Sequence, residues 1–178
     1  MSREKLIEMA LNNKKHSDAG TMEYVDSILE IPAANYYDPD IWQKEVDLIF
    51  KRTPLVLGVS KEIPNPGDYK SIDALGVPVL ISRDSKGDLN AYLNACRHRG
   101  AALVENGVGN KKRFGCPYHG WTYSEDGSLI GISSQEDFGE IDKTCKSLVR
   151  LPVLEKAGII WVILTPDSKV DMEKFLFG

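Results

Sequence analysis

Cysteine and histidine are scarce in this chain, with three residues of each type among 178. So few cysteines argue against the disulfide framework of a small secreted domain. They fit a reducing compartment, where thiols stay free to bind metal. Positive charge is not in excess either, since 22 Lys and Arg stand against 26 Asp and Glu. Because affinity for nucleic acid rests mainly on clustered Lys and Arg, we expect no nucleic-acid partner.

Long apolar runs are also absent from the N-terminus. Residues 1–15 (MSREKLIEMALNNKK) carry charges in every turn, which argues against a secretory signal and a membrane-spanning helix. We therefore expect a cytoplasmic protein with no membrane partner. The length of the chain and its 42% hydrophobic content suffice for one well-packed core and a small accessory subdomain.

Helices are predicted in residues 1–50, which would form an N-terminal arm. The clearest helix lies in residues 38–50 (DPDIWQKEVDLIF), where Asp38 can cap the first turn and a proline follows it. Residues 3–13 and 21–30 show weaker helical periodicity. The apolar residues of the clearest helix share one face, which is expected to be buried: Trp42, Val46, Ile49 and Phe50.

Short β-like runs begin at Leu55 and are separated by Gly, Pro, Asn and Asp. Two predicted hairpin turns, residues 84–88 and 124–128, each contain glycine where the backbone needs a positive φ. This pattern predicts a mainly β fold of antiparallel strands over residues 51–166. Residues 167–178 form a short amphipathic tail.

Two short segments hold most of the residues that can bind a metal: CRHRG (96–100) and CPYHGW (116–121). Thiolates favour zinc or iron–sulfur centres, and imidazole suits several metals. Two centres therefore fit. One is a structural zinc ion that takes all four ligands and staples the two loops. The other is a [2Fe-2S] cluster in which the cysteines bind one iron and the histidines the other. The four candidate ligands are Cys96, His98, Cys116 and His119.

Glycine lies just beyond each histidine, at Gly100 and Gly120, and lets the backbone turn tightly and point amide donors at the sulfurs of a cluster. The whole pattern resembles the Rieske iron–sulfur domain in the large subunits of ring-hydroxylating oxygenases. The resemblance covers about residues 36–165 and departs at Pro54, where these proteins often carry Trp. It implies a Rieske-type antiparallel β-sandwich preceded by N-terminal helices, with a cluster-binding subdomain of two loops at about residues 94–125.

By this resemblance, Cys96 and Cys116 bind one iron of a Rieske [2Fe-2S] cluster, and His98 and His119 bind the other. High-potential Rieske proteins carry an extra cysteine pair, and a serine where this chain has Trp121. We therefore expect a potential at the low end of the Rieske range, roughly −150 mV. The residues expected around the ligands are Arg99, Gly100, Tyr118, Gly120 and Trp121. Of these, the two aromatic residues are expected to belong to the core.

The resemblance implies electron transfer. The chain would accept electrons from a ferredoxin or a flavin reductase and pass them toward the mononuclear iron of an oxygenase catalytic domain, which would begin near residues 167–178. That iron needs two histidines and a carboxylate, and His16 is the only histidine left. The chain alone should therefore hydroxylate nothing and carry no catalytic residue. The family also implies a homotrimer.

Two other functions remain open at this point. The first is a stand-alone Rieske ferredoxin, although free-standing carriers usually begin almost at the β domain and this chain has helices before it. The second is an interaction module that is stapled by zinc and has no redox role. A colourless protein with stoichiometric zinc would identify the second alternative.

Basic residues gather around the metal-binding segments of an otherwise acidic chain: Arg97, Lys111, Lys112 and Arg113. They predict a docking face for an acidic ferredoxin or reductase, since opposite charge speeds encounter. A solvated hairpin tip explains them equally well. Tyr123 is a further candidate donor to a sulfur, although the spacing does not require it. We expect no function for the thiol of Cys145 or for the acidic residues between positions 136 and 140.

Overall fold

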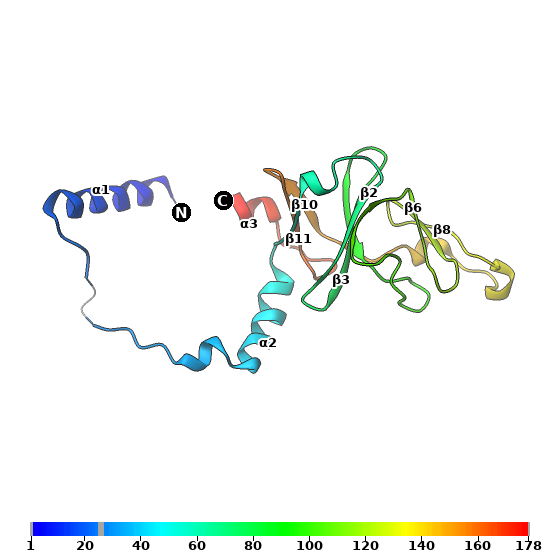
Figure 1. Cartoon of the computed structure of the whole chain (residues 1–178), viewed down its shortest axis with the longest axis horizontal. Helices are drawn as coiled ribbons and strands as arrows, with labels where there is room; N and C mark the ends of the chain where they lie inside the picture. The colour runs from blue at the N-terminus through cyan, green and yellow to red at the C-terminus, as the bar shows by residue number, and fades with distance from the viewer. Residues whose placement is uncertain (1, 25–26, 178) are drawn as a thin grey trace.

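The structure, a computed structural model, describes residues 2–24 and 27–177 and is dominated by antiparallel strands (Figure 1). Its strands are β1 (Leu55–Val59), β2 (Asp68–Ala74), β3 (Val77–Arg83), β4 (Leu89–Leu93), β5 (Gly107–Asn110), β6 (Arg113–Gly115), β7 (Thr122–Ser124), β8 (Leu129–Gly131), β9 (Arg150–Leu151), β10 (Val153–Lys156) and β11 (Ile159–Val162). Its α-helices are α1 (Arg3–Ala19), α2 (Pro39–Leu48) and α3 (Met172–Phe177). Its 3-10 helices are η1 (Ala33–Tyr36), η2 (Phe50–Arg52), η3 (Ser60–Glu62), η4 (Gln135–Phe138) and η5 (Lys143–Lys146).

Within the described part of the chain, the strands form three antiparallel sheets. The central sheet has the order β5-β2-β3-β4-β9, and the smaller sheets have the orders β1-β11-β10 and β6-β7-β8. Both predicted hairpin turns form, with Gly87 at φ +89° and Gly127 at φ +82°. The prediction of a mainly β, antiparallel fold is confirmed.

Strand β3 lies between two hydrophobic cores. Val79 and Ile81 belong to one core, together with Ile160 of β11. Leu80 belongs to the other core, together with Phe114 of β6. Because successive side chains of a strand point to opposite faces, the central sheet is covered on both sides. One face carries the sheet β1-β11-β10, and the other face carries the loops and strands that contain the candidate metal ligands.

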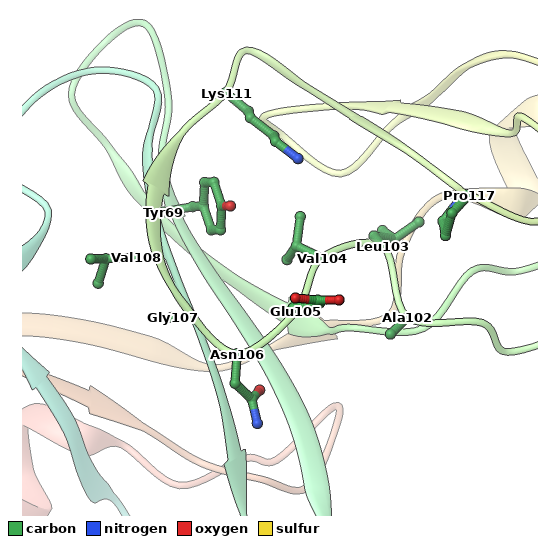
Figure 2. Close-up of a pocket in the computed structure, with 10 residues that line it drawn as sticks. All are labelled: Tyr69, Ala102, Leu103, Val104, Glu105, Asn106, Gly107, Val108, Lys111 and Pro117. Carbon is green, nitrogen blue, oxygen red and sulfur yellow. The ribbon is translucent and has the colours of Figure 1, made fainter.

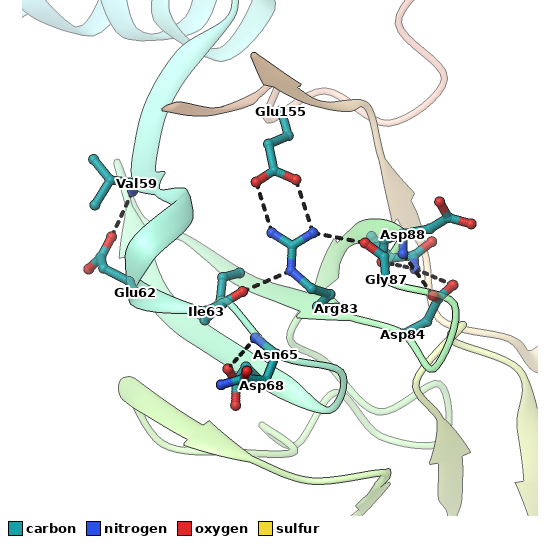
Figure 3. A network of polar contacts seen from close by, with 11 residues as sticks. Val59, Glu62, Ile63, Asn65, Asp68, Arg83, Asp84, Gly87, Asp88 and Glu155 are labelled. Atoms are coloured by element: carbon teal, nitrogen blue, oxygen red, sulfur yellow. Dashed lines mark hydrogen bonds and ion pairs between the residues drawn. The ribbon is translucent and has the colours of Figure 1, made fainter. Parts of the chain in front are cut away.

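An ion pair between a buried arginine and a partly exposed glutamate joins two of the sheets (Figure 3). Arg83, at the end of β3, donates to both carboxylate oxygens of Glu155 on β10, at 3.0 and 2.8 Å. The same guanidinium donates to the carbonyl oxygens of Ile63 and Gly87, each at 2.8 Å. The Arg83 side chain is 10% exposed. A buried charge is tolerated when it is paired and hydrogen-bonded, as it is here.

The N-terminal arm differs in part from the prediction. Helix α1 forms, but residues 21–24 and 27–30 are not helical, and residues 25–26 lie outside the described residues. The helix ends at Gly20, which adopts the left-handed conformation (φ +62°) and directs the chain away from the helical path. No residue of α1 is buried. Residues 21–24 and 27–30 are all exposed, so in these residues no tertiary packing stabilises a second helix.

Helix α2 begins as predicted, since Asp38 accepts hydrogen bonds from two backbone amides of its first turn. Its predicted buried face is only partly buried. Val46 is buried, whereas Trp42 and Ile49 are each 51% exposed. The helix ends at Leu48, so the last predicted member of the face, Phe50, lies in η2 and packs its ring on that of Trp42 at 5.6 Å.

Candidate metal centre

Two loops with the same turn follow β4 and β6. In both loops, the amide of the cysteine donates to the carbonyl five residues later, at 2.8 Å. The Gly100 amide donates to the Cys96 carbonyl at 2.8 Å, and the Gly120 amide donates to the Cys116 carbonyl at 3.1 Å. Both glycines have positive φ, +73° and +65°. Glycine adopts this conformation without steric cost, so the predicted role of the two glycines in turning the loops is confirmed.

The two cysteines form the inner side of the site and are 3% and 5% exposed. The sulfur of Cys96 lies 3.4 Å from the hydroxyl of Tyr123, a fully buried residue of β7. That hydroxyl also accepts a hydrogen bond from the Arg97 amide at 2.9 Å. Burial raises the pKa of Cys96, the Tyr123 hydrogen bond lowers it, and the nearby thiol of Cys116 raises it. The sulfurs of Cys96 and Cys116 are therefore neighbours. The Tyr123 hydroxyl is close enough to the Cys96 sulfur to be the donor for which Tyr123 was a candidate from the sequence.

The two histidines form the outer side of the site and are half-buried. The ring centroids of His98 and His119 lie 4.6 Å apart, with the ring planes at 63°. The Nδ1 atom of each ring is buried and has no hydrogen-bond partner in the described part of the chain. Burial lowers the pKa of His98, and the charges of His119 and Arg99 lower it further. A lowered pKa favours the neutral imidazole, which is the form that binds metal.

This donor set fits a two-iron cluster. Buried polar atoms are almost always hydrogen-bonded, so two adjacent Nδ1 atoms without a partner require another ligand, and a metal supplies one. A pair of thiols beside a pair of imidazoles is the donor set of the Rieske [2Fe-2S] centre. Within residues 2–24 and 27–177, no three His, Cys, Asp or Glu side chains are grouped as ligands of a single ion.

Aromatic side chains cover the histidines. Trp121, 2% exposed, stacks on His98 with centroids 5.2 Å apart and planes at 13°. Phe138 of η4 meets His98 edge-on, with centroids 5.3 Å apart and planes at 86°. Tyr118 lies against His119 at 3.7 Å. The prediction that Trp121 belongs to the core is confirmed, but the same prediction for Tyr118 is wrong, because its side chain is 60% exposed.

Two contributors were not predicted from the sequence. Asn94, which is buried, uses its Nδ2 atom to donate to the Val104 carbonyl at 2.7 Å and its Oδ1 atom to accept from the Leu103 amide at 2.9 Å. It therefore joins the two ends of the first loop. Phe138 comes from a segment that was interpreted only as an acidic, solvated loop. Neither residue lies in a metal-binding motif, so no spacing rule could have found them.

The predicted basic residues lie at the surface near the loops, and all are exposed: Arg97, Lys111, Lys112 and Arg113. A hollow of about 500 Å³ lies beside Lys111, and Figure 2 shows the residues that line it. Lys111 and Tyr69 form one side of this hollow, and Pro117 of the second loop lies at the other. The Lys111 ammonium group is 5.9 Å from the centre of the Tyr69 ring.

Comparison with known proteins agrees with this geometry. A sequence model described as the Rieske [2Fe-2S] domain matches residues 53–150. The chain belongs to the Rieske [2Fe-2S] domain family. Its cofactor is accordingly a Rieske-type [2Fe-2S] cluster, and the alternative of a structural zinc ion receives no support from the family match.

Rieske relatives of this chain are large subunits of ring-hydroxylating dioxygenases. The anthranilate 1,2-dioxygenase large subunit of Acinetobacter baylyi is 32% identical over 152 residues, which are 85% of this chain and 32% of that subunit. Naphthalene 1,2-dioxygenase from Rhodococcus sp., solved with bound indole, has a TM-score of 0.76 at 34% identity. The match covers 83% of this chain and 34% of the dioxygenase chain.

A third similar protein, a quaternary ammonium Rieske monooxygenase, has a TM-score of 0.75 at 30% identity, over 83% of this chain and 40% of its own. Its structure was described as giving insight into carnitine oxidation and inter-subunit electron transfer. This chain spans about a third of the length of the curated relatives that it matches. No helix in the described residues has the length and apolar character needed to cross a membrane.

The remaining cysteine and histidine lie outside the Rieske loops. Cys145 is exposed in η5, and its thiol donates to Asp142 at 3.0 Å, which raises the pKa of the cysteine. His16 lies near the end of α1 and contacts the Thr21 hydroxyl at 3.0 Å. Neither side chain is near the paired ligands, so each offers a matched control for them.

Proposed function

We propose that this chain carries single electrons on a Rieske [2Fe-2S] cluster, with Cys96 and Cys116 bound to one iron and His98 and His119 bound to the other. The observation that carries this proposal is the pair of buried, unpartnered Nδ1 atoms next to two buried thiols. When bound, the cluster supplies one-electron redox chemistry at the low end of the Rieske range.

The residues of the chain have separate roles in this site. The turns at Gly100 and Gly120 set the shape of the two loops. The Tyr123 hydroxyl is the proposed donor to the Cys96 sulfur. Trp121 keeps water from one face of His98. Burial favours the neutral form of His98. The neighbours proposed for the cluster are Arg99, Gly100, Tyr118, Gly120 and Trp121.

The electrons are proposed to pass to a mononuclear iron outside these 178 residues. The relatives are oxygenase large subunits, and the similarity to them includes the helix before the β strands. Both observations support the N-terminal Rieske part of an oxygenase subunit over a free-standing ferredoxin. We propose three regions: an N-terminal arm (1–50), the Rieske domain (51–166, with its cluster-binding part at about 94–125) and a tail (167–178) that leads to a catalytic domain. The family match at residues 53–150 supports the middle region.

Electron exchange between copies is also proposed, in a homotrimer. The supporting observation is that a similar monooxygenase is described in connection with inter-subunit electron transfer. In the proposed trimer, the outer histidine side of one copy would face a neighbouring copy. We place the protein in the cytoplasm, which is supported by the free state of all three cysteines.

A ferredoxin or flavin reductase with an acidic surface is the proposed electron donor. Lys111, Lys112 and Arg113 are exposed beside a hollow that Pro117 of the second loop also lines. Charge reversal at Lys111 and Lys112 should slow second-order electron transfer from an acidic ferredoxin by about tenfold at low salt. Stopped-flow measurement at several salt concentrations tests this, with reversal of Lys169 and Lys174 in the tail as the control. Equal rates for both variants would contradict the docking face.

The cluster itself is tested by iron, sulfide and zinc analysis of the anaerobically purified chain, with EPR spectra before and after dithionite. The parent chain should hold about two irons and two sulfides and give the low average g value of mixed His and Cys ligation. Each of the variants C96S, H98A, C116S and H119A should lose that signal. The controls C145S and H16Q should keep it. Stoichiometric zinc in a colourless parent protein would overturn the proposal.

A further inference from the structure

In the described part of the chain, Phe138 contacts the ring of His98 from outside the two loops. It lies at the end of η4, between β8 and β9, where Ser134 (φ +51°) and Gly139 (φ +68°) flank the 3-10 turn. Both residues have positive φ, which bends the chain on each side of the turn. The ring is partly buried and packs on the same core as Trp121.

The ring of Phe138 forms a cluster of three rings with those of His98 and Trp121. It stands nearly perpendicular to His98 (5.3 Å, 86°) and to Trp121 (6.0 Å, 74°), which are themselves stacked. The rings that contact His119 in the described part of the chain are those of His98 and Tyr118, and the Tyr118 side chain is 60% exposed. The two histidines therefore differ in the rings that pack on them: Trp121, which contacts His98, is buried, and Tyr118 is exposed.

We propose that Phe138 is a positioning residue for His98. It stops the imidazole from rotating away from Trp121, and it keeps water from the side of His98 that Trp121 leaves open. This inference rests on the proposed function, in which His98 binds iron. It assigns a redox role to a residue that follows two exposed acidic side chains, Glu136 and Asp137.

Two measurable consequences follow from this arrangement. The cluster gains one negative charge on reduction, and nearby water stabilises that charge, so exclusion of water by Phe138 should lower the midpoint potential. A ring that cannot rotate is also slow to leave its metal. The Phe138 contact should therefore slow the loss of iron to a chelator.

The experiment compares the parent 178-residue chain, carrying its cluster, with F138A, F138L and I141A. Ile141 is the matched control, because it is partly buried against the same core but has no ring contact with His98. The measurements are the midpoint potential by voltammetry and the rate of iron release to a ferrous chelator. In F138A the potential should rise, and iron release should speed up by about three- to tenfold, as expected for the loss of an aromatic contact. F138L should restore most of the parent potential, because leucine still excludes water.

The outcomes separate the two proposals. If the parent chain binds no [2Fe-2S] cluster, the proposed function fails before Phe138 is tested. If the parent binds the cluster and F138A has the same potential as the parent, the positioning role of Phe138 is overturned. The role is also overturned if I141A shifts the potential and the rate of iron release as much as F138A does.

Discussion

The Tyr123 hydroxyl touches both a ligand sulfur and the backbone of a loop. It lies 3.4 Å from the Cys96 sulfur and accepts from the Arg97 amide at 2.9 Å. Replacement by phenylalanine should lower the midpoint potential, because hydrogen bonds to sulfur stabilise the reduced cluster. It should also cost about 1 kcal/mol of unfolding free energy through the lost hydrogen bonds. Voltammetry and urea unfolding measure the two effects.

Tyr92 provides the control for this substitution. It is as buried as Tyr123, but its hydroxyl is 3.5 Å from the Arg150 guanidinium, away from the cysteines. Y92F should therefore leave the potential unchanged. A potential that moves equally in Y92F and Y123F would mean that general loosening of the core, and not the contact with sulfur, sets the value.

Gly100 and Gly120 occupy the same position in the two loops but have different surroundings. A Cβ atom at Gly100 would meet nothing within 4 Å, whereas one at Gly120 would collide with Ser133. G100A should cost about 1–2 kcal/mol of unfolding free energy, the cost of a left-handed alanine. G120A should cost more, and the additional S133G substitution should return its stability to the level of G100A. Equal urea midpoints for G100A and G120A would contradict the collision.

At this scale, the motifs predicted the four candidate ligands and both glycines, because those residues follow short, fixed spacings. The contacts of Tyr123, Asn94 and Phe138 could not be derived in the same way. Each contact depends on the folded chain bringing distant segments together. The sequence contains many other aromatic and amide residues that could equally well have been predicted to make these contacts. The exposure of Tyr118 is a related case, since an aromatic residue beside a turn can lie on either side of it.

At the scale of elements, capping and turn signals were the most reliable predictors. Asp38 starts α2, and the glycines of both predicted hairpins adopt positive φ, because these features depend only on neighbouring residues. Burial of the helices was less predictable. Helix α1 is only weakly amphipathic. In the amphipathic helix α2, whether an apolar side chain such as Trp42 is covered depends on tertiary contacts that local sequence does not specify.

The ion pair between Arg83 of β3 and Glu155 of β10 should make the stability of the protein depend on pH. Hydrogen bonds from Arg83 hold the pKa of Glu155 below its ordinary value. A lowered carboxyl pKa contributes stability above the unfolded-state pKa and loses it as the pH falls through the folded-state pKa. At pH 7, E155Q should therefore be less stable than the parent by about 1–3 kcal/mol, and the difference should shrink as the pH approaches 3.

The control is E173Q, which removes the carboxylate from an exposed pair with Lys156. Exposed pairs contribute little, so its unfolding free energy should stay within about 0.5 kcal/mol of the parent at every pH. Urea unfolding of the parent, E155Q and E173Q at four or five pH values between 7 and 3 measures these differences in unfolding free energy. A gap between E155Q and the parent that is constant from pH 7 to pH 3 would rule out the carboxylate as its source.

At the scale of the whole molecule, the part of the arm that precedes α2 is separable from the β body. No residue of α1 or η1 is buried, and Figure 1 shows α1 apart from the sheets. A chain that begins at Asp38 should therefore unfold within about 2 °C of the parent and keep its iron, since surface changes have small effects on stability. Differential scanning calorimetry with iron analysis tests this. A large drop in melting temperature would mean that the arm packs on the body or on a neighbouring copy.

The pairing of β1 with β11 has a practical consequence for electrochemistry. It brings the strand that follows α2 beside the strand that precedes α3. The N-terminal arm and the C-terminal tail therefore both join the β body on the side away from β6 and β8 (Figure 1). A biotin or thiol handle on the arm or the tail would anchor the protein to an electrode by that side. The two loops would then point into the electrolyte, open to a soluble redox partner while the current is recorded.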